Sequence, residues 1–65
     1  MKVREVIRLV ESDGWFIVRT TGSHRQFHHP TKPGTVTVAG QLHKTMPTGT
    51  LNSVLKQAGL KGDDE

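Results

Sequence analysis

Residues 15–29 read W-F-I-V-R-T-T-G-S-H-R-Q-F-H-H, and the architecture of this 65-residue chain can be built outward from them. Residues 15–19 are rich in aromatic and β-branched side chains, which favour a strand. Residues 20–23 have the composition of a turn. Residues 24–29 alternate weakly around Phe27, their one apolar member, and predict a second strand. The stretch therefore predicts a β-hairpin with Phe27 on its buried side.

The residues before this hairpin predict a helix over about 2–12. Its apolar positions recur at the spacing of one helix face: Val3, Val6, Ile7 and Val10. Gly14 follows, where a left-handed residue commonly ends a helix. Trp15 is expected in the core, because it opens a strand beside the end of that helix.

A third strand is predicted after the hairpin. Residues 30–34, P-T-K-P-G, should form a loop because two prolines cannot donate to a strand ladder. Residues 35–39, T-V-T-V-A, then alternate cleanly, which predicts a strand with Val36 and Val38 pointing inward.

Segment 40–48 has no period, and we expect a connecting loop anchored by Leu42 and Met46. A second helix should follow, with Thr48 or Thr50 supplying the N-cap oxygen. Its apolar residues at helical spacing, with Val54 and Leu55 toward the sheet, are Leu51, Val54, Leu55 and Ala58.

Gly59 is expected to end this helix, with Leu60 folding back onto it. The predicted order is α-β-β-β-α, an α+β fold with a three-stranded antiparallel sheet and both helices on one face. Double-stranded-RNA-binding domains have this layout, although a shared fold does not establish function. We expect one domain over residues 1–60 and a polar tail over residues 61–65.

The charges are unevenly distributed along the chain, whose net charge is +3. No carboxylate side chain occurs between Gly14 and Gly62. The same span carries six basic residues: Arg19, Arg25, Lys32, Lys44, Lys56 and Lys61. Such a one-sign surface suits a polyanion, or serves solubility alone, and charge by itself does not decide between them. The absence of carboxylates does exclude a catalytic pair of carboxylates from the middle of the chain.

Other function classes are limited by what the sequence lacks. Without cysteine there is no disulfide or thiolate zinc site. No apolar run approaches the roughly 20 residues needed to span a bilayer, and the N-terminus lacks the apolar core of a signal peptide. We therefore expect a cytoplasmic protein with no membrane partner.

Three of the four histidines lie in the hairpin stretch. By strand parity His24 and His28 share the open face, roughly 13 Å apart, too far to bind one metal ion. His28 and His29 point to opposite faces, and His43 would have to fold in. We therefore expect no metal and no cofactor.

His24 directly follows a Gly-Ser turn, where backbone N–H groups can converge on an anion. Arg25 is next to it in sequence, and Lys44 is expected in the loop before the second helix. An imidazole beside anion-binding groups suits RNA cleavage by internal 2′-hydroxyl attack. The alternative is a surface histidine that caps a hairpin, and the spacing alone favours this alternative.

Several motifs in order, over residues from about 3 to 60, resemble the HicA family of mRNA-interferase toxins. They are G-W (14–15), G-S-H (22–24) with Phe27 three residues later, V-T-V (36–38) and G-T-L-N-S-V-L-K-Q-A-G-L (49–60). The resemblance implies the α-β-β-β-α fold, endoribonuclease activity on mRNA within a toxin–antitoxin pair, and an antitoxin partner of the HicB type.

The resemblance implies that His24 is catalytic, with Gly22 and Ser23 shaping its turn. We expect electrostatic help for the phosphate from the remaining candidate site residues: Arg25, Lys44, Thr48, Gly49 and Thr50.

The chain departs from the family pattern after the third strand. Ala39-Gly40-Gln41 stands where the family commonly has Pro-x-His, and His43 is the nearest imidazole that could replace it. Two alternatives to a nuclease remain: a non-catalytic RNA-binding module, or a degenerate toxin kept for antitoxin binding. Against the first, the loop before the second helix has only Lys44 rather than a lysine cluster.

Overall fold

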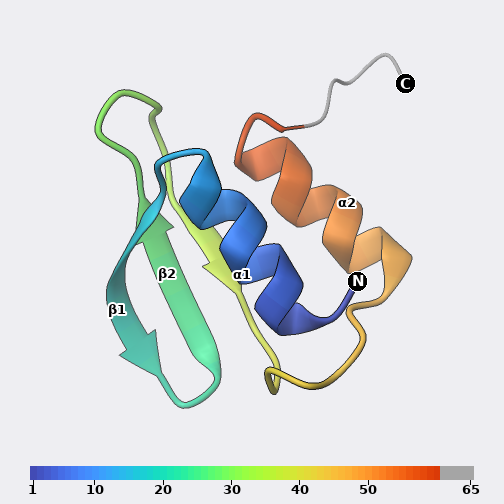
Figure 1. Ribbon diagram of the computed structural model, residues 1–65. Helices are drawn as coiled ribbons and strands as arrows, with labels where there is room; N and C mark the ends of the chain where they lie inside the picture. The colour runs from blue at the N-terminus through green and yellow to red at the C-terminus, as the bar shows by residue number, and fades with distance from the viewer. Residues whose placement is uncertain (61–65) are drawn as a thin grey trace.

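The computed structural model describes residues 1–60 of the chain, so the expected polar tail at 61–65 lies outside the described residues. Its order is α-β-β-β-α, which confirms the predicted α+β fold (Figure 1). The elements are α1 (Val3–Ser12), β1 (Phe16–Thr21), β2 (His24–His28), β3 (Val36–Val38) and α2 (Thr48–Gln57).

The three strands form one antiparallel sheet in the order β1-β2-β3. The hairpin is confirmed, but β1 runs to Thr21 because the turn uses only Gly22 and Ser23. Gly22 has φ +59°, which fits the first position of a two-residue type II′ turn. The register shifts between Ile17 and Arg19, so a β-bulge interrupts the edge strand β1.

Both helices cover the same face of the sheet, and their buried side chains share one core with it (Figure 1). Phe27, Val36 and Val38 point into this core and are fully buried, as the alternation predicted. Trp15 is also buried, which confirms its expected place. The core residues from the helices and the loop are Val3, Val6, Val10, Met46, Val54 and Ala58.

Both helices end in the same way, with a left-handed glycine followed by an apolar residue. At α1, Gly14 has φ +107° and the Trp15 N–H donates to Val10 O (3.2 Å). At α2, Gly59 has φ +71° and the Leu60 N–H donates to Leu55 O (2.8 Å). This is the Schellman pattern, which satisfies the last carbonyls and folds the following side chain back.

The start of α2 differs from the prediction. Pro47 occupies the N-cap position and no side chain caps the helix, so neither Thr48 nor Thr50 has that role. Thr48 is already the first helical residue, and the Leu51 N–H donates to Pro47 O (2.9 Å). A proline with extended backbone therefore begins this helix.

Two expected packing residues also lie elsewhere. Leu42 is 49% exposed and does not anchor its loop; Met46 does, at 4% exposure. Leu55 is only half-buried and lies outside the core. Val54 in α2 and Ala58 at its C-cap form the buried line, and Leu55 is one residue, about 100° of rotation, away from Val54.

Candidate functional site

His24 is the first residue of β2 and is exposed, directly after the Gly22-Ser23 turn. It pairs with Thr21 across the hairpin. Because Phe27 is buried on the helix side, strand alternation directs His24 to the open face of the sheet. The sequence placed it there correctly, at the end of the sheet where the hairpin turns.

Arg25 points to the other side and is built into the fold. Its Nη1 donates to Ser23 O (3.1 Å) within the turn and to Gly40 O (2.9 Å) in the loop after β3. The guanidinium therefore ties the hairpin turn to that loop, a contact between residues 15 positions apart. Its charge lies at the turn, while Nη1 is occupied by backbone carbonyls.

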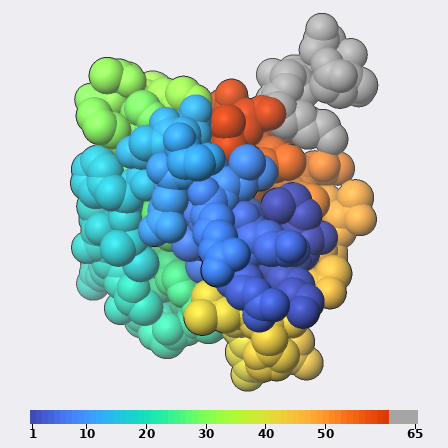
Figure 2. Space-filling view, in the orientation of Figure 1, coloured from blue at the N-terminus to red at the C-terminus, as the bar shows by residue number. Residues whose placement is uncertain are grey.

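The loop 39–46 lies at the same end of the molecule as the hairpin turn (Figure 1). Figure 2 shows it as a projecting yellow lobe beside the teal hairpin and the blue helix α1. It carries His43 and Lys44, and both are exposed. The structure thus brings the loop that holds these two residues to the hairpin end of the molecule.

The loop is held by the beginning of the chain. The Val3 N–H donates to Lys44 O (2.9 Å) and the Arg4 N–H to Leu42 O (3.1 Å). The Met46 N–H donates to Met1 O (2.8 Å). The loop carbonyls therefore satisfy the first N–H groups of α1, which lack partners within the helix.

The first turn of α2 carries Thr48, Gly49 and Thr50, and all three are exposed. In Figure 1 it lies on the opposite side of the 39–46 loop from the hairpin turn. The structure therefore does not bring these three residues next to His24. The proximal group consists of the hairpin turn, Arg25 and the loop with Lys44.

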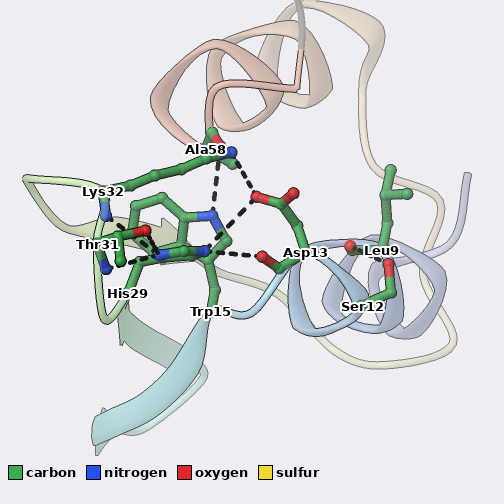
Figure 3. A network of polar contacts seen from close by, with 8 residues as sticks. All are labelled: Leu9, Ser12, Asp13, Trp15, His29, Thr31, Lys32 and Ala58. Carbon is green, nitrogen blue, oxygen red and sulfur yellow. Dashed lines mark hydrogen bonds and ion pairs between the residues drawn. The ribbon is translucent and has the colours of Figure 1, made fainter.

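A second histidine, His29, has a structural role that the sequence reading missed (Figure 3). Its Nε2 donates to Asp13 O (2.7 Å), while its Nδ1 accepts from the N–H groups of Thr31 and Lys32 (both 3.1 Å). Its ring meets the Trp15 ring edge-on, with centroids 5.2 Å apart. A His next to a Pro-containing loop was the only sequence signal for this role.

The same network closes the end of the molecule opposite the hairpin turn. The Lys32 Nζ donates to Asp13 Oδ2 (2.5 Å) and to Ala58 O (3.0 Å), and Trp15 Nε1 also donates to Ala58 O (3.3 Å). The Lys32 ammonium holds the pKa of the Asp13 carboxyl below its ordinary value. These contacts join the ends of both helices to the loop after β2.

Two absences concern residues 1–60, the part of the chain that the structure describes. No three His, Asp or Glu side chains in this part of the chain gather to hold a metal ion. Neither helix described there is long and apolar enough to cross a membrane.

Comparison with known proteins gives one family. A family model described as "HicA toxin of bacterial toxin-antitoxin" matches residues 3–60 of the 65. No curated protein matches the chain significantly. The matched span contains every described element of the fold.

Proposed function

The chain belongs to the HicA toxin family of bacterial toxin–antitoxin systems, and on that premise we propose that it is an endoribonuclease that cleaves mRNA. The proposal assigns His24 as general acid/base and requires no metal ion. It is carried by one observation: an exposed imidazole at a hairpin turn, on a sheet face to which the central chain contributes no carboxylate.

The chemistry follows from the geometry of an RNA phosphodiester. His24 takes the proton of a 2′-hydroxyl, whose oxygen attacks the adjacent phosphorus. The bond from phosphorus to the 5′-oxygen breaks, and that oxygen leaves with a proton. The products are a 2′,3′-cyclic phosphate and a 5′-hydroxyl. The backbone of Gly22 and Ser23, with the charges of Arg25 and Lys44, would stabilise the negative charge on the phosphate oxygens.

A second proton-transfer group is needed if His24 acts only as base. His43 is our candidate, because its loop is tied to the hairpin turn through the bond from Arg25 to Gly40. It would replace the imidazole of the Pro-x-His pattern that this chain lacks. Thr48, Gly49 and Thr50 would contribute through the N-terminus of α2, at longer range.

The partners we propose are mRNA and an antitoxin of the HicB type, and the compartment is the cytoplasm. The antitoxin would cover the sheet face around His24, since masking the imidazole blocks both binding and cleavage of RNA.

The test is cleavage of a single-stranded RNA by purified protein in excess EDTA. The His24→Ala variant should remain folded and lose about 10²–10⁴-fold in turnover, the usual contribution of a general acid/base. His28→Ala is the matched control, because His28 is exposed on the same face roughly 13 Å further along the strand. His29 is unsuitable as a control, since its ring holds the Trp15–Lys32 network.

The products and the growth phenotype complete the test. A 2′,3′-cyclic phosphate end distinguishes internal attack from attack by water. Expression of the wild type should stop growth unless the antitoxin is present, and the His24→Ala variant should not. Full cleavage by folded His24→Ala would refute the assignment, and inhibition by EDTA would indicate a metal enzyme. Binding without cleavage by the wild type would favour an RNA-binding module or a degenerate toxin.

A further inference from the structure

The open face of the sheet carries an exposed aromatic side chain. Phe16 pairs with His28 across β1 and β2, while the neighbouring Phe27 is fully buried on the helix side. Because strand neighbours alternate between faces, Phe16 and His28 project together from the open face. Phe16 is 49% exposed there. The hydrogen bond between His28 Nε2 and Thr35 Oγ1 (3.1 Å) holds the imidazole beside it.

The same face places a cation between Phe16 and His24. Arg19 pairs with Gln26. Gln26 lies midway between His24 and His28 on β2. At the usual rise, the level of Arg19 is roughly 7 Å from His24 along the strands, and the level of Phe16 is roughly 13 Å away. The imidazole of His24, the guanidinium of Arg19 and the ring of Phe16 therefore follow one another along one face of the sheet.

We propose that this face binds single-stranded RNA next to the cleaved bond, with an unpaired base stacked on Phe16 and a flanking phosphate on Arg19. The inference rests on the proposed function, because it takes the RNA cut at His24 as the ligand. Exposed aromatic rings beside cations are the usual means of holding unpaired nucleotides. Duplex RNA cannot bind in this way, since its bases are stacked on one another.

Charge complementarity favours RNA over a second copy of this chain on this surface, because the net charge of the chain is +3. No carboxylate occurs in the chain between Gly14 and Gly62 to repel phosphate. The side chains around Phe16 on this face carry imidazole, guanidinium, amide and hydroxyl groups. Ile17, an exposed apolar neighbour, pairs with Phe27 and so faces the other side, while Val18, which is also exposed, lies at the bulge between Ile17 and Arg19. A single ring among polar and cationic groups suits a base better than an apolar protein surface.

The test uses, in excess EDTA, an oligonucleotide with 2′-O-methyl groups, which lacks the attacking hydroxyl and so stays intact against both internal attack and attack by metal-activated water. Its affinity is measured by fluorescence anisotropy. Phe16→Ala should weaken binding about 5- to 150-fold, the range for loss of one base–aromatic contact. Phe16→Tyr keeps the ring and should retain most of the affinity. Ile17→Ala is the matched control and should leave the affinity unchanged.

Two further measurements separate stacking from charge. An abasic oligonucleotide with the same phosphates should bind Phe16→Ala and the wild type equally well, whereas Arg19→Ala should weaken its binding. Phe16→Trp should show fluorescence quenching by the base-containing strand beyond that of the wild type, whose only tryptophan is Trp15, at 2% exposure.

Unchanged affinity of folded Phe16→Ala for the single strand would overturn the inference, as would equal loss in Ile17→Ala. A wild-type dimer that Phe16→Ala converts to a monomer, with RNA affinity unchanged, would assign the face to a second copy of the chain instead. Because the probe cannot be cleaved, these results do not depend on whether His24 is catalytic. Failure of cleavage and failure of stacking are therefore seen in different assays.

Discussion

Replacing Phe27 by alanine should remove much of the stability of this protein. Phe27 is fully buried between the sheet and both helices. A Phe→Ala change in a core costs about 3–5 kcal/mol, because transfer energy is lost and a cavity remains. At about 0.05–0.15 kcal/mol per residue, a 65-residue chain has about 3–10 kcal/mol in total. The change should thus cost between about a third and all of the stability.

The second phenylalanine provides a matched control. Phe16→Ala makes the same chemical change on the adjacent strand, at a position that is 49% exposed. Surface substitutions usually stay within about 0.5 kcal/mol. In a domain of this size each 1 kcal/mol shifts Tm by about 4–8 °C. Phe27→Ala should therefore lower Tm by about 12–40 °C, and Phe16→Ala by about 4 °C at most.

Thermal and urea unfolding can be followed through Trp15, which is buried beside the end of α1 and becomes exposed on unfolding. The two variants should differ widely in midpoint while their urea m-values stay similar. Equal midpoints would refute the assignment of the two faces of the sheet. A larger loss of stability for Phe16→Ala than for Phe27→Ala would show that the core lies on the face assigned here as open.

Three further predictions concern charge and backbone. RNA affinity should fall as salt is raised, with a slope of a few in a plot of log affinity against log salt concentration, as for a handful of phosphate contacts. Fluorescence anisotropy across a salt series measures this slope, and an affinity that does not change with salt would contradict the prediction. Asp13 and Glu5 have lowered pKa values, caused mainly by the Lys32 ammonium and by a backbone N–H. Their contribution is complete above the ordinary values of 3.8 and 4.5 and is lost as the pH falls through the lowered ones, so Tm should drop in acid, and less so in Asp13→Asn. Gly22→Ala should destabilise by about 1–2 kcal/mol, because φ is +59° although the space is open. Gly49→Ala, in equally open helical surroundings, should stabilise by about 0.4–1 kcal/mol, and denaturant melts of the two compare them.

Local patterns were enough to predict the elements and most of the core. The inward positions of Phe27, Val36 and Val38 follow from strand alternation, and both helix ends follow from a glycine before an apolar residue. The N-cap of α2 was predicted wrongly because threonine at a helix start is common, whereas the chain uses Pro47. The prediction that Leu55 faces the sheet was wrong, because helical spacing identifies an apolar stripe without showing which edge of the stripe contacts the sheet.

In the candidate site, too, one feature could be predicted from the local sequence and another could not. The position of His24 after its turn could be read from the order of Gly22, Ser23 and His24, since a two-residue hairpin is a local structure. The contact of Arg25 with Gly40 could not be predicted in this way, because Gly40 is 15 residues away and is reached only when β3 pairs with β2.

By itself, the sequence determined the order of the elements, the basic middle of the chain and the family, all of which depend on neighbouring residues and composition. The tertiary structure alone decided which polar side chains support the fold and which stay exposed. His24 and His29 look alike in the sequence. The fold brings Asp13 and Trp15, which are distant in sequence, against His29 and so makes its ring part of the framework. His24 remains exposed.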